Sequence, residues 1–154
     1  MEKVSIPGGW VSEVFAEDVQ KLIEEVQELS DMAERLEDNI QNLHKWLIPL
    51  SKTQYAIVVL ESLIRDKLER YKPNDNFAQS YLYRINIYVN DIMDAIRDLT
   101  EEYKKASSTG IDPYITRRYL QEIKIKARDI IRTLRDAIKY NVFVIENPNE
   151  RVIM

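Results

Sequence analysis

Residues 15–50, FAEDVQKLIEEVQELSDMAERLEDNIQNLHKWLIPL, carry the strongest structural signal in the chain. Apolar residues recur in this stretch at alternating spacings of four and three, which is the heptad period of an amphipathic helix. Further apolar residues flank the heptad positions and widen the stripe, as in a multi-helix bundle. We therefore predict one long helix, with Ser12 as its N-cap and Pro49 as its end. The a positions are Val19, Val26, Ala33, Ile40 and Leu47, and the d positions are Phe15, Leu22, Leu29, Leu36, Leu43 and Leu50.

Three further helices follow the first. The segment 51–54 has the spacing of a capping box, so a second helix is expected to begin there and to run to about residue 71. A third helix is predicted over 76–106. Residues 81–89 within it also alternate as a strand would, but the heptad spacing continues through them. Asp112 and Pro113 are a typical N-cap and first residue, so a fourth helix should begin there and end near residue 141.

Together these segments predict an all-α fold, an up-down-up-down four-helix bundle with long heptad-patterned helices. The chain of 154 residues fits one domain. We divide it into an N-terminal segment at 1–11, four helices at 12–141 and an apolar tail at 142–154. The tail could form a short β-hairpin from 142–145 and 151–154, with residues 4–6 as a further strand.

The composition excludes several kinds of chemistry. The chain has no cysteine and only one histidine, His44. Zinc ribbons, thiol catalysis and any metal site with two histidines are therefore excluded. Three glycines cannot supply a phosphate-binding loop or the turns of an all-β barrel. Accordingly, we expect no catalytic, metal-binding or cofactor-binding residues.

Charge is unevenly distributed along the chain, whose net charge is −4. Residues 1–51 carry 11 acidic and 4 basic side chains, whereas residues 113–141 carry 3 acidic and 8 basic ones. We interpret this as two helices that lie side by side and attract each other. The alternative is a basic face on the fourth helix that binds nucleic acid. That face consists of Arg117, Lys124, Arg128, Arg135 and Lys139.

One motif resembles that of an enzyme family. Glu24-Glu25-x-x-Glu28 is similar to the Glu-Glu-x-x-Glu motif of the MazG-like nucleotide pyrophosphatases, which are all-α and hold Mg²⁺ with carboxylates. The resemblance implies nucleoside triphosphate hydrolysis. The family's second motif, Glu-x-x-Asp on the next helix, is missing, and Asp91-x-x-Asp94 on the third helix is the nearest substitute. The heptad register directs Glu24 and Glu28 to solvent.

Helix lengths predict an interface between subunits. The first helix would span about 37 residues, or roughly 55 Å, and the second about 20 residues, or roughly 30 Å. The second helix would then be too short to cover the start of the first, whose apolar residues would be exposed. Such exposed apolar surface favours a homodimer. The predicted interface residues are Phe15, Val19, Leu22, Ile23 and Val26.

The function we expect is that of a non-enzymatic helical bundle acting through protein–protein contacts, as a structural, assembly or regulatory subunit. A nucleic-acid-associated factor is the first alternative and a MazG-like hydrolase the second. No signal peptide or long apolar span is evident, so we expect a cytoplasmic protein with no membrane contact. Isoleucine outnumbers leucine, 19 to 13, which is typical of thermophiles and of AT-rich genomes, and an archaeal or viral source would fit.

Overall fold

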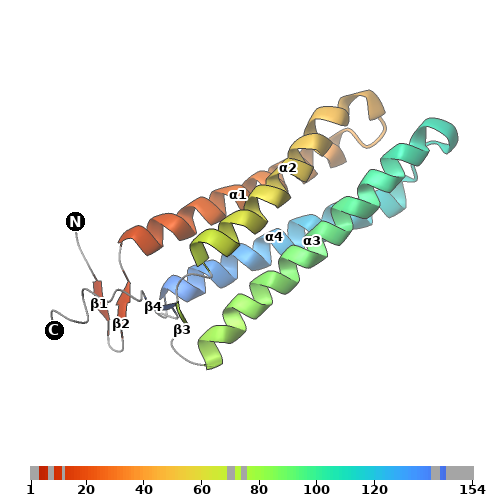
Figure 1. Ribbon diagram of the computed structural model, residues 1–154. Coiled ribbons are helices and arrows are strands. Elements are labelled where there is room, and N and C mark those ends of the chain that lie inside the picture. Colours follow the sequence, from red (N-terminus) through yellow and green to blue (C-terminus); the bar gives the residue numbers. More distant parts are fainter. Residues whose placement is uncertain are drawn as a thin grey trace.

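Four long helices make up most of the chain: α1 (Glu13–Asp38), α2 (Leu47–Leu63), α3 (Asn76–Thr109) and α4 (Pro113–Lys139). The computed structural model describes residues 4–6, 9–11, 13–68, 72–73, 76–139 and 143–144. Figure 1 shows the four helices side by side in one elongated bundle, with the α1–α2 and α3–α4 connections at the same end. Helix α4 packs against α1 and α3, and α2 packs mainly against α1. The prediction of a helical bundle is confirmed.

The first helix ends earlier than predicted. It stops at Asp38, and the side-chain amide of Asn39 donates a hydrogen bond of 2.9 Å to the carbonyl of Arg35 in its last turn. A short 3₁₀ helix, η1 (Leu43–Lys45), then leads into α2. Pro49 lies in the first turn of α2, where its missing N–H costs no helical hydrogen bond. The prediction that Pro49 ends the first helix is therefore wrong, and so is a second helix that begins at residue 51.

A buried tryptophan closes this turn. Trp46 is fully buried, and its indole N–H donates a hydrogen bond of 2.8 Å to the carbonyl of Asn39. Its ring stacks on Tyr103 of α3, with ring centroids 6.0 Å apart and planes 3° apart. Residues 39–46 depart from α-helical geometry here, although the heptad spacing runs through them.

Short irregular elements lie at the opposite end of the bundle. The π-helical turn η2 (Ile64–Leu68) extends α2, and the strand β3 (Lys72–Pro73) pairs antiparallel with β4 (Phe143–Val144). Strands β1 (Val4–Ile6) and β2 (Gly9–Val11) form a second antiparallel pair. The tail hairpin was predicted to use residues 151–154, which lie outside the described residues.

The second half of the chain follows its sequence pattern closely. Helix α3 continues through residues 81–89, so the helical interpretation of that stretch is confirmed. The carboxylate of Asp112 accepts hydrogen bonds from the backbone N–H groups of Tyr114 (3.0 Å) and Ile115 (3.2 Å), as expected of an N-cap. Gly110 ends α3 with a φ of +77°, a conformation that glycine adopts without strain.

One apolar core runs along the inside of the bundle. All four helices contribute to it, and its α4 stripe is the one predicted from the sequence: Leu120, Ile123, Ala127, Ile130, Leu134 and Ala137. From α1 it contains a and d residues of the heptad from Val19 to Leu36, so α1 buries the expected face, and Ile40 of the following turn joins the same core. The heptad residue Leu47, in contrast, is 61% exposed. The exposed side chain of Leu47 is part of the candidate site described below.

Candidate functional site

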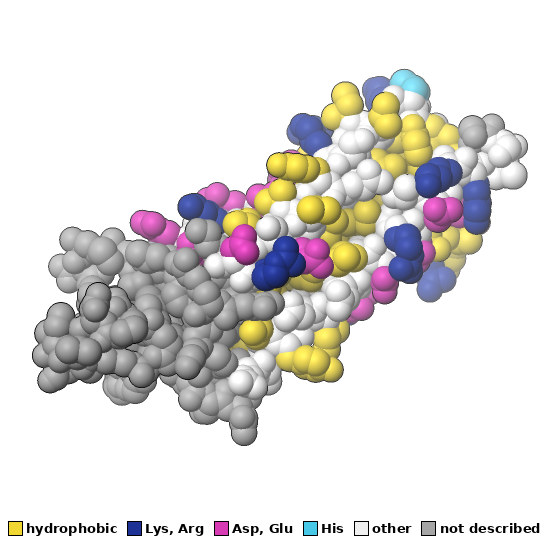
Figure 2. Space-filling view, viewed as in Figure 1, with side chains coloured by type: hydrophobic (Ala, Val, Ile, Leu, Met, Phe, Trp, Pro, Cys, Tyr) yellow, Lys and Arg dark blue, Asp and Glu magenta, His cyan; other side chains and the backbone are white. Residues whose placement is uncertain are grey.

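Helix α2 exposes a row of large apolar side chains. Leu47, Ile48, Tyr55 and Val58 are 61%, 68%, 72% and 61% exposed. At 100° per residue they fall within an arc of about 100° on the helix, so they form one stripe, which we call the α2 outer face. Figure 2 shows hydrophobic side chains gathered along the surface formed by α2. Contiguous exposed apolar surface of this kind usually has a partner.

The opposite face of α2 is apolar as well. Leu50, Ala56, Ile57 and Leu60 are buried in the core, so α2 lacks the polar side that a surface helix normally shows. The segment Leu47–Asp66 is by length and composition alone apolar enough to cross a membrane, and a third of its most apolar stretch is buried in the bundle. Core helices of soluble proteins pass the same test. The apolar residues of 47–63 are spread around the helix rather than confined to one stripe, and this is the sequence signal that could have revealed the α2 outer face.

A groove of about 740 Å³ runs between α1 and α2, beside the α2 outer face. Its α1 wall carries three carboxylates, those of Glu24, Glu25 and Glu28. Its α2 wall is mostly apolar or small, and Lys52 is the only cation in the lining. The α2 residues that line it are Leu47, Ile48, Ser51, Lys52, Tyr55 and Ala56.

The three carboxylates of this groove lack basic partners. None of them forms an ion pair with a cation in the described side chains of 17–66, 79–106 and 108–139, although Glu24 accepts a weak hydrogen bond from Gln20 (3.4 Å). Burial raises the pKa of Glu25 above its ordinary value, and the negative charges of Glu28 and Glu24 raise it further. The α1 wall is thus a patch of three carboxylates without an ion pair among the described residues, beside an apolar stripe.

The structure does not assemble the carboxylates of the MazG-like motif into a metal site. Asp91 of α3 pairs with Lys126 (3.4 Å), and Asp94 pairs with Arg97 (3.1 Å), whereas the glutamates of the motif line the groove between α1 and α2. Within the described residues, no group of three or more His, Asp or Glu side chains could hold a metal ion. His44 lies in the exposed η1 turn.

The predicted subunit interface at the start of α1 is not available on the surface of this chain. Val19, Leu22 and Val26 are at most 1% exposed because they belong to the chain's own core, and Ile23 packs against that core. The side chain of Phe15 lies outside the described ones. The prediction assumed a first helix of about 37 residues. Helix α1 has only 26 residues, so α2 and η2 together reach along it and pack against the part that a longer first helix would have left exposed.

The basic helix α4 and the acidic helix α1 do lie side by side. Lys124 pairs with Glu34 (2.8 Å) and with Glu37, and the guanidinium of Arg117 lies 3.9 Å from the Glu37 carboxylate. Burial alone would lower the pKa of Lys124, but the hydrogen bonds and charges of Glu34 and Glu37 outweigh burial and raise it. Two members of the predicted basic face are therefore partly neutralised by α1.

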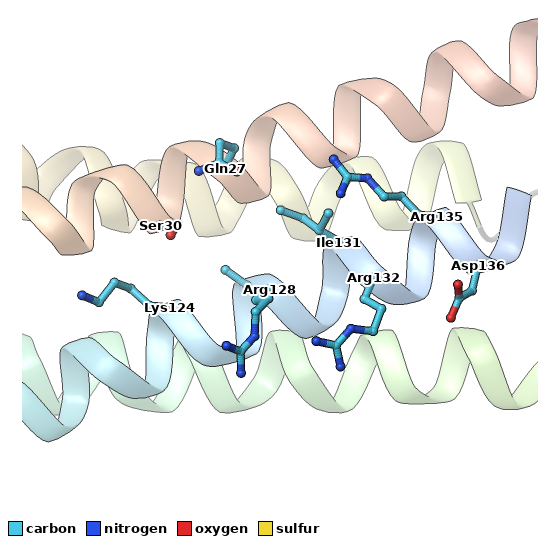
Figure 3. Close-up of a pocket in the computed structure, with 9 residues that line it drawn as sticks. Gln27, Ser30, Lys124, Arg128, Ile131, Arg132, Arg135 and Asp136 are labelled. Carbon is cyan, nitrogen blue, oxygen red and sulfur yellow. The ribbon is translucent and has the colours of Figure 1, made fainter. Parts of the chain in front are cut away.

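A second groove, of about 480 Å³, lies between α1 and α4 and is lined by Lys124, Arg128, Arg132 and Arg135. Within the described part of the chain, Arg128 and Arg135 make no ion pair, whereas Arg132 pairs with Asp129 (3.8 Å) and Lys139 has a partner. Figure 3 shows that the cations do not converge, since Arg135 extends toward α1 while Arg128 and Arg132 point away from it. A small anion would thus not meet all four at once.

Comparison with protein-family models, with curated proteins and with solved structures found no match to this chain.

Proposed function

We propose that this protein is a non-enzymatic helical bundle that works through protein–protein contacts, as a structural, assembly or regulatory subunit. The observation that supports this is the α2 outer face, with four large apolar side chains more than 60% exposed in one stripe. The scaffold that we propose for this function is an up-down-up-down bundle with long heptad-patterned helices, and α2 presents the stripe on its outer side. Homodimerisation and contact with another protein both fit this function.

Photo-crosslinking tests this proposal. A benzoylphenylalanine replaces Tyr55 in one preparation and Tyr114, which is 74% exposed on α4, in a control preparation. We expect a crosslink to protein, either this chain or another, from position 55 only, and its loss when Ile48→Glu is added. Crosslinks of equal yield from both positions, or none from position 55, would overturn the proposal.

The absence of catalysis is part of the same proposal. It is supported by the separate locations of the MazG-like glutamates and of Asp91 and Asp94, whose side chains pair with cations instead. We expect no Mg²⁺-dependent release of pyrophosphate or phosphate from nucleoside triphosphates above background. Turnover that Glu24→Gln abolishes would contradict this expectation.

Nucleic-acid binding is a second candidate function. It is favoured by Arg128 and Arg135, which line the α1–α4 groove without an acidic partner in the described residues. Against it stand the neutralised Lys124 and a net charge of −4 on the whole chain. Submicromolar binding of duplex DNA at about 0.15 M salt, lost in the Arg128→Glu/Arg135→Glu variant, would favour this class over protein contact.

A further inference from the structure

We infer that the α2 outer face and the adjacent α1–α2 groove bind a basic amphipathic helix of a partner protein. This inference rests on the proposed function and specifies the partner. It requires two features of one surface to act together, the apolar stripe of α2 and the acidic wall of α1. Figure 2 shows them next to each other, with acidic side chains along the edge formed by α1.

The apolar stripe sets the length of the partner. Leu47 and Val58 are separated by eleven positions, about 16 Å along the helix axis, which corresponds to three helical turns. Ser51 lies on the same arc and lines the groove, so its small side chain permits close approach in the middle of the stripe. A helix with apolar residues at i, i+4, i+7 and i+11 matches this surface, as in other helix-in-groove complexes.

The acidic wall sets the charge of the partner. Two groups of glutamates on helix α1 differ in their ion pairs with the part of the chain that the structure describes. Glu34 and Glu37 pair with Lys124 of α4, whereas Glu24, Glu25 and Glu28 form no ion pair within the described residues and share their groove with a single lysine, Lys52. Lysine or arginine residues along one edge of a docked helix would supply the missing positive charge, and charge complementarity of this kind selects the partner.

Charge also disfavours two other occupants of the surface. A twofold dimer through this surface pairs the same patch with itself, so the acidic walls of both copies would crowd into one interface. An anionic membrane surface would be repelled by the same carboxylates. The chain's own α4 is basic and amphipathic, but its apolar side is already buried in the core, so α4 cannot be the ligand in this fold.

Two synthetic helices test the inference by fluorescence anisotropy with the full chain. One is an 18-residue amphipathic peptide of leucine and lysine, and the other has glutamate in place of every lysine. We expect the basic peptide to bind at least about tenfold more tightly than the acidic one at about 0.15 M salt, with a difference that shrinks as salt is raised.

Three variants identify the surface. Tyr55→Ser should abolish binding of the basic peptide, and Glu24→Gln/Glu25→Gln/Glu28→Gln should weaken it about tenfold or more. Asp94→Asn/Asp98→Asn/Glu101→Gln changes the net charge equally on the surface of α3 and should leave the affinity unchanged. All substituted side chains are at least partly exposed, and circular dichroism of each variant confirms that it is folded.

The outcomes separate this inference from the proposed function. If Tyr55→Ser abolishes binding while the glutamate triple variant does not, the surface binds protein but does not select for basic helices, and only the inference fails. A dimer that excludes the peptide, or a preference for anionic phosphatidylserine vesicles over the peptide, would also overturn the inference. If the peptides do not bind and position 55 gives no protein crosslink, both fail.

Discussion

Replacing Trp46 with alanine should destabilise the protein more than any surface substitution, because this residue joins the α1–α2 turn to α3. The substitution removes a fully buried indole, its 2.8 Å hydrogen bond to Asn39 and its stacking on Tyr103. Truncation of a buried tryptophan to alanine costs about 3–5 kcal/mol. Since domains of this size are stable by about 5–15 kcal/mol, the variant should lose a large share of its free energy of unfolding.

Trp46→Phe separates the hydrogen bond from the packing. Phenylalanine keeps an aromatic ring against Tyr103 but cannot donate to the Asn39 carbonyl, so we expect a smaller loss of about 1–2 kcal/mol. The matched control is Tyr114→Ala, whose side chain is 74% exposed and whose loss should change stability by no more than about 0.5 kcal/mol.

Urea denaturation followed by far-ultraviolet circular dichroism measures all three variants. For a chain of this length, 1 kcal/mol shifts Tm by about 2–4 °C, so Trp46→Ala should lower Tm by about 6–20 °C. A loss below about 1 kcal/mol for Trp46→Ala would refute the reasoning that this side chain stabilises the fold by joining the turn to α3.

Three further predictions concern single residues. Leu36→Asp places an unpaired charge at a fully buried position and should cost more than about 4 kcal/mol; a folded variant of near wild-type stability in urea would contradict this. Glu25→Gln should stabilise the protein at pH 7, because the raised pKa of Glu25 means that the fold disfavours its ionised form. That gain should be complete above the raised pKa and vanish below the ordinary value of 4.5; urea titrations across this range showing the opposite trend would rule it out. Gly110→Ala should cost about 1 kcal/mol by thermal unfolding because of its φ of +77°, while a clash cannot contribute since nothing lies within 4 Å of the added methyl. An alanine variant as stable as the wild type would argue against strain at this C-terminus.

Helix α4 and most of α3 could be predicted from the sequence because their signals are local. The apolar stripe of α4 repeats at helical spacing, and Asp112, Pro113 and Gly110 mark helix ends through hydrogen bonds and backbone angles of their own neighbourhood. The attraction between the acidic residues 1–51 and the basic residues 113–141 was also predictable. In the structure, Lys124 forms ion pairs with Glu34 and Glu37.

The candidate site could not be found from the heptad pattern. Leu47 continues the a series of the first helix, and its spacing therefore predicted a buried residue. In the structure the chain turns at 39–46, a new helix begins with its own phase, and Leu47 points outward beside Ile48. The same error lengthened the first helix and led to the predicted interface at Val19, Leu22 and Val26, which the core buries.

Helix period and capping depend on residues within one or two turns, so spacing alone predicted that most of the chain is helical and which face α1, α3 and α4 bury. Where α1 ends and which side of α2 meets solvent are visible only in the folded chain. The turn between α1 and α2 contains Trp46, which packs against Tyr103 of another helix, and a spacing rule within one segment carries no information about such a contact. The different pairing of the α1 glutamates is visible for the same reason, since only the fold shows that Lys124 of α4 reaches Glu34 and Glu37, while Glu24, Glu25 and Glu28 line a groove beside α2.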